Sequence, residues 1–265
     1  MLQMLYRVLI ELTNGRWSSA ILKRFSRSGI SRYIVPSFAK AYHLNQSEME
    51  RELKAYRSLH ELFVRTLKKG TRPIDKSTDS VVSPVDAVVE EVGTIGETSE
   101  IKVKGKIYSI EEMLGDQESL HKYLNGAYII LYLSPSHYHR IHSPVDGTVT
   151  KQWMMGSKSY PVNKWGLKYG VRTLAKNYRV ITEVKTLFGH VAIVKVGAMF
   201  VNSIETTHQG STLTKGGEIA YFSFGSTVVL LFEKGVFQMD PSIHTPKDIK
   251  MGEKLGTFTD KKKSP

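Results

Sequence analysis

Residue types that together can activate a nucleophile occur in three short segments of this chain. The segments are Phe224-Gly225-Ser226-Thr227, Tyr138-His139-Arg140-Ile141-His142-Ser143-Pro144 and Ser83-Pro84-Val85-Asp86. A serine hydroxyl is a weak nucleophile, and a histidine that is oriented by a carboxylate is a common way to activate it. The sequence therefore predicts an Asp–His–Ser arrangement, and the target of the serine is open at this point.

The histidines also have simpler interpretations. His139 and His142 are three residues apart and could bind a metal ion, but no convincing third ligand lies nearby, so no metal site is expected. Either one could instead be a structural hydrogen-bonding group. His137 is interpreted as a surface residue without a role, and His208 is left unassigned.

One short segment recurs: Ser83-Pro84-Val85-Asp86 returns as Ser143-Pro144-Val145-Asp146. Each copy is followed by Ala or Gly and then by a β-like run. Pro-Val-Asp-Gly is a good hairpin turn, and four residues are too few to establish a duplication. Asp146 is therefore an alternative to Asp86 as the orienting carboxylate.

The elements that must position these residues are mostly short strands. From residue 71 onward, β-rich segments alternate with Gly and Pro, too closely spaced for a doubly wound fold. The pattern predicts an α+β protein with a β-rich body of short, mostly antiparallel strands. We expect strands over 81–92, 101–107, 127–133, 148–153, 178–184, 190–196, 218–222, 227–232 and 255–258, and short helices over 110–114 and 119–124.

Residues 1–70 have helical spacing instead. Apolar residues recur over 2–12 and again over 17–25, and a third helical region is expected from Ser47 to Gly70. The first 70 residues hold 13 Lys/Arg against 5 Asp/Glu, which is most of the excess in a chain of formal net charge +12. Basic amphipathic helices are typical of an anionic membrane interface, although the same stripes could pack onto the rest of the protein.

Composition limits the remaining possibilities. The absence of cysteine excludes disulfides and thiolate chemistry. No run of about 20 apolar residues is long enough to span a membrane, and the apolar N-terminus, interrupted by Arg7 and Glu11, does not have the pattern of a signal peptide. No segment resembles a known DNA- or RNA-recognition motif, so no nucleic-acid partner is expected.

Taken together, four segments resemble the phosphatidylserine decarboxylase family, of the prokaryotic type. They occur in the family's order between about residues 60 and 232. Two departures, Phe224 where the family often has Leu and Ala87 where it often has Gly, remove no reactive group. The segments are Phe63-Val64-Arg65-Thr66-Leu67-Lys68-Lys69-Gly70-Thr71-Arg72-Pro73-Ile74 and the three segments named first.

The resemblance implies that the serine first attacks its own backbone. Ser226 would attack the carbonyl carbon of Gly225, with His142 as the base and Asp86 orienting it. Glycine at this position permits close approach to its carbonyl. The resulting ester would break by β-elimination into chains 1–225 and 226–265, which stay together as a non-covalent heterodimer. Ser226 would become a pyruvoyl group at the start of the second chain.

The resemblance further implies a lyase that converts phosphatidylserine to phosphatidylethanolamine and CO2 in phospholipid biosynthesis. The pyruvoyl group from Ser226 would be the covalent cofactor, forming a Schiff base with the substrate amine as pyridoxal phosphate does elsewhere, so that no pyridoxal phosphate is needed. His139 is the candidate for returning a proton or for positioning the substrate carboxylate.

These inferences divide the chain into a helical, membrane-associating region over 1–70 and a β-rich catalytic domain over 71–265, cut between 225 and 226. The expected location is the cytoplasmic side of the cell membrane, as a peripheral protein. The rival hypotheses are a serine hydrolase, a binding protein without activity, and decarboxylation of another aminoacyl-like headgroup. The hydrolase is disfavoured because Ser226 lacks a Gly-x-Ser-x-Gly context.

Overall fold

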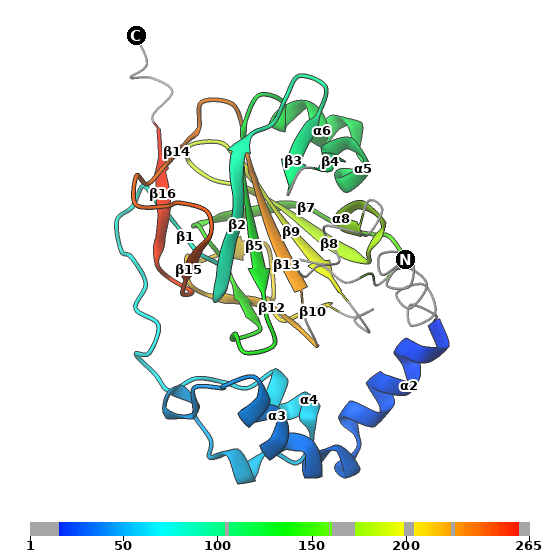
Figure 1. Cartoon of the computed structure of the whole chain (residues 1–265). Coiled ribbons are helices and arrows are strands. Elements are labelled where there is room, and N and C mark those ends of the chain that lie inside the picture. The colour runs from blue at the N-terminus through cyan, green and yellow to red at the C-terminus, as the bar shows by residue number, and fades with distance from the viewer. Residues whose placement is uncertain are drawn as a thin grey trace.

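A computed structural model describes residues 16–103, 106–158, 160, 173–198, 204–223 and 226–259. A body of strands carries short helices on one side, and a separate group of helices from the N-terminal region lies beyond one end of its strands (Figure 1). The strand pairs of the named sheets are antiparallel, so the predicted α+β class with a β-rich body is confirmed.

The helical region has a small apolar core of its own. Pro36 lies in the first turn of α3, where its missing N–H costs nothing, and the Ser58 side chain caps α4 by accepting from the Glu61 backbone. Its elements are α2 (Arg16–Arg27), α3 (Val35–Ala41), α4 (Leu59–Phe63) and the 3-10 turns η1 (Gly29–Ile34), η2 (Gln46–Glu48) and η3 (Leu53–Ala55). Its buried core residues are Val35, Ala39, Leu44, Met49, Tyr56, Leu59 and Leu62.

The helix predicted from Ser47 to Gly70 is wrong in extent. Helical structure there is limited to η2, η3 and α4, because the segment folds back and pairs with itself. Met49 bridges Leu67, and the Lys68 N–H donates to the Glu48 carbonyl at 2.9 Å. Local spacing cannot reveal such a long-range pairing. The predicted helix over 17–25 corresponds to α2, whereas the stripe over 2–12 lies outside the described residues.

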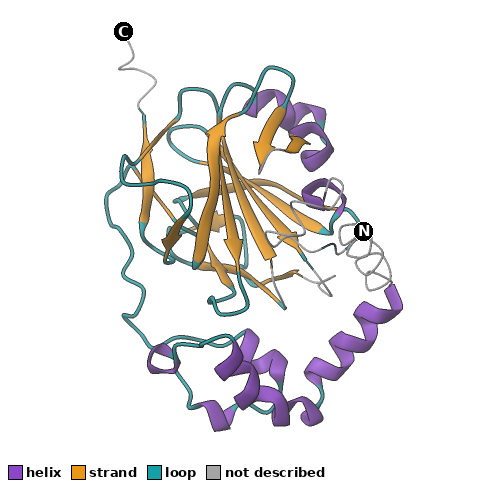
Figure 2. Cartoon of the chain, viewed as in Figure 1, coloured by secondary structure: helices purple, strands orange, loops and turns teal. Residues whose placement is uncertain are grey.

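The β body is built on one large antiparallel sheet with two smaller sheets (Figure 2). The large sheet has the order β11 (Thr212–Leu213), β7 (Gly147–Met155), β8 (Arg179–Lys185), β9 (His190–Gly197), β13 (Ser226–Phe232), β5 (Ala127–Leu133), β2 (Ala87–Thr94) and β15 (Lys247–Ile249). The smaller sheets are β1 (Ser80–Val82), β16 (Lys254–Phe258) and β14 (Phe237–Met239), and β10 (Ile204–Thr206), β12 (Glu218–Phe222) and β6 (Arg140–His142).

Strand β13 lies at the centre of the large sheet and is buried on both faces. Val228 and Leu230 point into a core shared with the two smaller sheets, whereas Val229 and Leu231 point to the opposite core. That opposite core is covered by α5 (Ile110–Leu114), α6 (Gln117–Tyr123), α8 (Thr173–Lys176) and the hairpin of β3 (Glu100–Val103) and β4 (Lys106–Ser109). Burial on both faces explains why β13 is apolar without alternation.

Most of the predicted strands and both predicted short helices are confirmed. Two predicted strands are each divided: 81–92 forms β1 and β2, and 101–107 forms the β3–β4 hairpin. The first division falls at the turn Ser83-Pro84-Val85-Asp86.

The two Ser-Pro-Val-Asp turns lie side by side and pair with each other. The Val82 N–H donates to the Pro144 carbonyl at 3.0 Å, and the His142 N–H donates to the Pro84 carbonyl at 2.8 Å. In both turns the serine hydroxyl donates to the valine carbonyl two residues later. The recurrence is therefore one turn structure used twice, in a reciprocal arrangement.

This reciprocity extends to the strands of the body. Each strand of one half of the body has a counterpart in the other half. If every strand of the large sheet is replaced by its counterpart, the same strand order results, listed from the opposite edge. The β1–β16 and β6–β12 pairs also shift register at equivalent residues. The body therefore consists of two equivalent halves, an internal duplication, and a two-fold axis relates them. One half is β6–β12, and in the sequence it is inserted between β5 and β13 of the other half. The counterparts are β1/β6, β2/β7, β5/β8, β13/β9, β14/β10, β15/β11 and β16/β12.

Candidate active site

Ser226 begins the central strand and is completely buried. It is paired with Leu133 of β5 on one side and Gly197 of β9 on the other. Its Oγ has no hydrogen-bond partner within the described part of the chain. A buried hydroxyl without a partner is costly in a stable fold, so this atom is a candidate reactive group. Phe224 and Gly225, including the carbonyl that Ser226 is expected to attack, lie outside the described residues.

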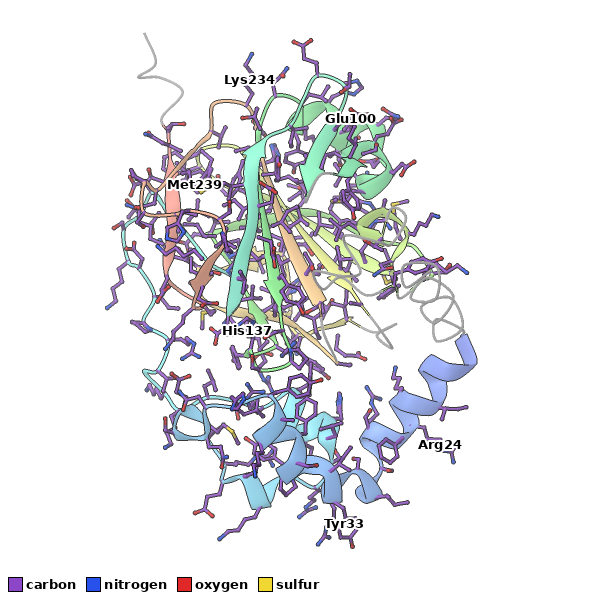
Figure 3. All side chains as sticks on the ribbon, viewed as in Figure 1. Arg24, Tyr33, Glu100, His137, Lys234 and Met239 are labelled. Atoms are coloured by element: carbon purple, nitrogen blue, oxygen red, sulfur yellow. The ribbon has the colours of Figure 1, made fainter. Side chains whose placement is uncertain are left out.

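Residues 134–144, called the histidine segment here, come close to Ser226 at two places in the backbone. It leaves β5 directly after Leu133, the sheet partner of Ser226, and its His139 carbonyl accepts from the Phe222 N–H at 3.0 Å, shortly before Ser226. His137, within this segment, lies at the end of the β body that faces the helical region (Figure 3). The fold therefore gathers the predicted serine and histidines at one end of the large sheet.

His142 has both ring nitrogens engaged. Its Nδ1 lies 2.8 Å from the Gly216 carbonyl, and since a carbonyl only accepts, Nδ1 carries the proton. Its Nε2 accepts from the Tyr138 hydroxyl at 3.2 Å. Burial lowers the pKa of His142, while the Gly216 carbonyl and the nearby acids Glu218 and Asp86 raise it in part. His142 is therefore a neutral imidazole, as a base must be.

Asp86 is bound by Arg72. Nε and Nη2 of Arg72 donate to the two carboxylate oxygens at 2.8 and 2.5 Å, and the Met251 N–H donates to Oδ1 at 2.9 Å. Nη2 of Arg72 also donates to Oε2 of Glu48, in the helical region, at 2.8 Å. This hydrogen bond lowers the pKa of Glu48. Asp86 is thus tied to both parts of the molecule.

Asp86, His142 and Ser226 do not form a hydrogen-bonded triad in the uncut chain. Among the described residues, no hydrogen bond joins any two of these three side chains. The backbone nevertheless brings Asp86 near His142, because the His142 N–H donates to the carbonyl of Pro84, two residues before Asp86.

His139 has the second unpartnered atom of the site. Its ring is completely buried and packs on Phe63, with ring centroids 4.0 Å apart. Nδ1 donates to the His137 carbonyl at 2.8 Å, whereas Nε2 has no partner within the described chain. Burial, followed by the charge of Arg65, keeps the pKa of His139 well below its ordinary value.

The other candidates of the sequence analysis lie outside this centre. Asp146 occupies the same turn position as Asp86, but it is exposed and accepts from the Lys215 N–H at 2.8 Å. The His208 ring donates to the Ile219 carbonyl at 3.2 Å. His137 is partly buried, and its Nδ1 accepts from the Ser134 N–H. The described residues contain no cluster of three His, Cys, Asp or Glu that could hold a metal ion.

Four residues of the site were not assigned a role from the sequence. Arg65, Arg72, Tyr138 and Gly216 each contact a carboxylate, an imidazole or the histidine segment, and three of them lie inside segments that the sequence analysis had already singled out. The partners of Arg65, Arg72 and Gly216 are distant in sequence, so only the fold reveals them, whereas Tyr138 contacts His142 within the same motif.

The fold and the site define a β-rich protein that holds a buried serine at the start of its central strand and buried histidines in the segment beside it. Comparison with known proteins identifies the family: the family model described as phosphatidylserine decarboxylase matches residues 59–257. The chain belongs to the phosphatidylserine decarboxylase family, and it is a carboxy-lyase.

The similar proteins cover the whole length of the chain. A phosphatidylserine decarboxylase proenzyme of Geobacillus sp. (strain WCH70) is 62% identical over 256 residues, which is 97% of this chain and 99% of that protein. The proenzyme of Anoxybacillus flavithermus (strain DSM 21510 / WK1) is 61% identical over 264 residues and 100% of both chains. That of Bacillus cereus (strain ATCC 10987 / NRS 248) is 54% identical over 253 residues, or 96% of this chain.

Proposed function

We propose that this protein cuts its own chain between Gly225 and Ser226 and then decarboxylates phosphatidylserine to phosphatidylethanolamine with a pyruvoyl group made from Ser226. The observation that carries the proposal is the buried, unpartnered Oγ of Ser226 next to a segment with two buried, neutral histidines. The relatives named proenzymes support a precursor that is processed.

In the first reaction, Ser226 Oγ attacks the carbonyl carbon of Gly225, and His142 takes the hydroxyl proton on Nε2. Tyr138 must first release that nitrogen, because its hydroxyl donates to Nε2 in the uncut chain. The Gly216 carbonyl holds the ring through Nδ1. The Asp86 charge favours protonated His142, which stabilises the imidazolium without a direct hydrogen bond.

The Gly225–Ser226 C–N bond then breaks as His142 gives its proton to the Ser226 nitrogen, which leaves Gly225 joined to Ser226 Oγ as an ester. β-Elimination breaks this ester. The alkoxy oxygen of Ser226 leaves as part of the new carboxylate of Gly225, and the Ser226 α-carbon loses a proton. Hydrolysis of the dehydroalanine releases ammonia and leaves a pyruvoyl group at residue 226. Strand β13 remains between β9 and β5, so the new chain end stays where the serine was.

The residues at this position fit a pyruvoyl group. Ser226 supplies the carbon atoms of the group, since its Oγ leaves with Gly225, and the free Nε2 of His139 supplies a proton-transfer group close by in the fold. A pyruvoyl group acts as an electron sink for the electrons that remain when CO2 leaves the substrate. His139 moves the proton to the carbon that has lost CO2.

Intact mass spectrometry under denaturing conditions tests the self-cleavage. We expect two chains divided at Gly225-Ser226, the smaller with a blocked pyruvoyl terminus, and uncut Ser226→Ala and His142→Ala variants. His139→Ala should be cut but inactive, which separates the two reactions. A wild-type chain that decarboxylates phosphatidylserine while it remains whole would refute the mechanism, and an uncut chain whose Ser226 reacts with a hydrolase probe would favour a serine hydrolase.

We also propose that the helical region docks the protein on an anionic membrane. Large apolar side chains stand exposed on it beside basic ones: Ile21 is 67% exposed, Ile30 70% and Tyr33 75%. Arg24 and Tyr33 project from the side of this region that faces away from the β body (Figure 3). No helix within the described ranges is both long and apolar enough to cross a membrane. Surface docking is the mode of attachment that such a basic, apolar face supports.

A further inference from the structure

Arg65 is a buried cation without a counter-ion among the described residues. It follows α4 and the C-cap residue Val64, and it is 5% exposed. Nη2 donates to the carbonyls of Ser136 and His137 at 2.8 and 3.0 Å. Within the described chain it forms no ion pair, and its Nε has no partner. An unpaired buried charge lowers the stability of a fold, so Arg65 requires another explanation.

The carbonyl of His137 links Arg65 to His139. It accepts from Arg65 Nη2 and, at 2.8 Å, from His139 Nδ1, which uses both of its lone pairs. Because the carbonyl cannot donate, the proton of the neutral His139 ring is on Nδ1. Nε2 therefore presents a bare lone pair, with no partner among the described atoms.

Most of the groups that face His139 favour its neutral form. Phe63 covers the ring with an apolar surface, and the charged neighbours are Arg65 and, when protonated, His137. Burial has the largest effect in lowering the pKa of His139, and the Arg65 charge follows. The His137 carbonyl opposes them in part.

We propose that Arg65 is a positioning residue that holds the carbonyls of Ser136 and His137 and so presents His139 as a neutral imidazole with a free Nε2. The inference deepens the proposed function, on which it rests. It also accounts for the proton that the decarboxylation needs: the substrate enters with an ammonium group, which must lose one proton before its nitrogen can react. His139 Nε2 accepts that proton and returns it to carbon after CO2 has left, so the enzyme ends as it began.

The direct test reads the tautomer and not the activity. In the 15N-histidine NMR spectrum of the self-cleaved protein, with the signals of His139 assigned by their loss in His139→Gln, we expect a protonated Nδ1 and an unprotonated Nε2. This state should persist at about pH 6, where an ordinary histidine is largely protonated. In Arg65→Gln we expect His139 to titrate at higher pH or to exchange between tautomers.

The kinetic test uses the pH profile of kcat/KM with phosphatidylserine in mixed detergent micelles. Removing the positive charge should raise the midpoint of the acid limb by about one pH unit in Arg65→Gln. Arg65→Lys, which keeps the charge, should retain the wild-type midpoint, and it replaces Arg65→Gln if that variant fails to fold. Arg51→Gln is the control, because Arg51 belongs to the same region but is exposed, near Glu61 and the ring of Tyr56.

Three results would overturn the inference: a wild-type His139 protonated at Nε2, an ordinary titration of His139, or an Arg65→Gln variant with unchanged spectrum and unchanged acid limb. If Arg65→Gln does not fold, an Arg65→Lys variant whose acid limb is raised by about one pH unit would also contradict it. The failure of the proposed function has a different signature: His139→Ala would decarboxylate normally, whereas the tautomer result would still stand.

Discussion

At the scale of single residues, two aspartates in the same turn show how surroundings decide a role. Asp86 and Asp146 each accept a backbone N–H from an equivalent segment, Met251 in one half and Lys215 in the other. Only Asp86 is buried and bound by Arg72. The turn therefore explains the position of both carboxylates, but only the buried Asp86 contributes to the pKa of His142.

This pair provides a matched prediction. Asp86→Asn removes the charge that favours protonated His142 and should slow self-cleavage at least about 100-fold, as the loss of the orienting carboxylate does in serine hydrolases. Asp146→Asn should cut at the wild-type rate. The measurement is the fraction of cut chain against time after synthesis, by denaturing electrophoresis, with melting curves to verify folding. Equal slowing in both variants would show that the turn, and not the charge, is what matters.

At the scale of elements, the helical region and the histidine segment are joined by the end of α4. Phe63 packs on His139, the Val64 carbonyl accepts from Arg140 Nε at 3.1 Å, and Arg65 binds the carbonyls of Ser136 and His137. Arg72 adds a second connection, from Glu48 to Asp86. A lipid bound through the outer face of this region would therefore lie next to the region that supports both reactions.

The docking proposal gives a prediction at this scale. Ile30→Asp combined with Tyr33→Asp should weaken binding to vesicles that contain anionic lipid about 10- to 100-fold, because two apolar side chains no longer enter the interface. Self-cleavage should be unaffected. Leu187→Asp is the control, since Leu187 is fully exposed but lies in the β8–β9 turn. Co-sedimentation measures the binding, and an equal loss in the control would contradict a specific docking face.

At the scale of the whole molecule, buried histidines make stability depend on pH. Burial lowers the pKa values of His60, His137, His139 and His142 in the folded chain. The unfolded chain binds protons at these residues near pH 6.5 and the folded chain does not, so stability is full above pH 6.5 and falls as the pH drops below it.

The expected result is a lower urea midpoint at about pH 5.5 than at about pH 7.5. The uncut Ser226→Ala variant should be used, so that a single chain unfolds. His60→Asn, which removes one of the four groups away from Ser226, should reduce the difference between the midpoints. Equal midpoints at the two pH values would contradict the prediction.

The sequence predicted what depends on local pattern and on the family's motifs. The apolar run of β13 and the periodicity of α5 are visible in single segments, and the reactive residues lie within recognisable motifs. The pairing of Met49 with Leu67 and the contacts of Arg65 and Arg72 depend on distant residues, so the sequence did not reveal them. The duplication was hidden because outside the shared turn the two halves have different residues at equivalent positions, as with His142 and Val82.

Because one half of the body is inserted into the other, the proposed cut would give two fragments that must associate to complete the fold. The proposed cut falls where the chain re-enters the first half, so the larger product would hold one complete half and only β1, β2 and β5 of the other. The smaller product would supply β13 to β16, in both the large sheet and a smaller one. We therefore expect the two chains to co-elute in native size-exclusion chromatography and to separate only in denaturant; dissociation of the native protein would contradict this. A peptide of residues 226–265 would thus be a folding partner, and the cut enzyme would keep its new chain end by the same strand pairing that completes the fold.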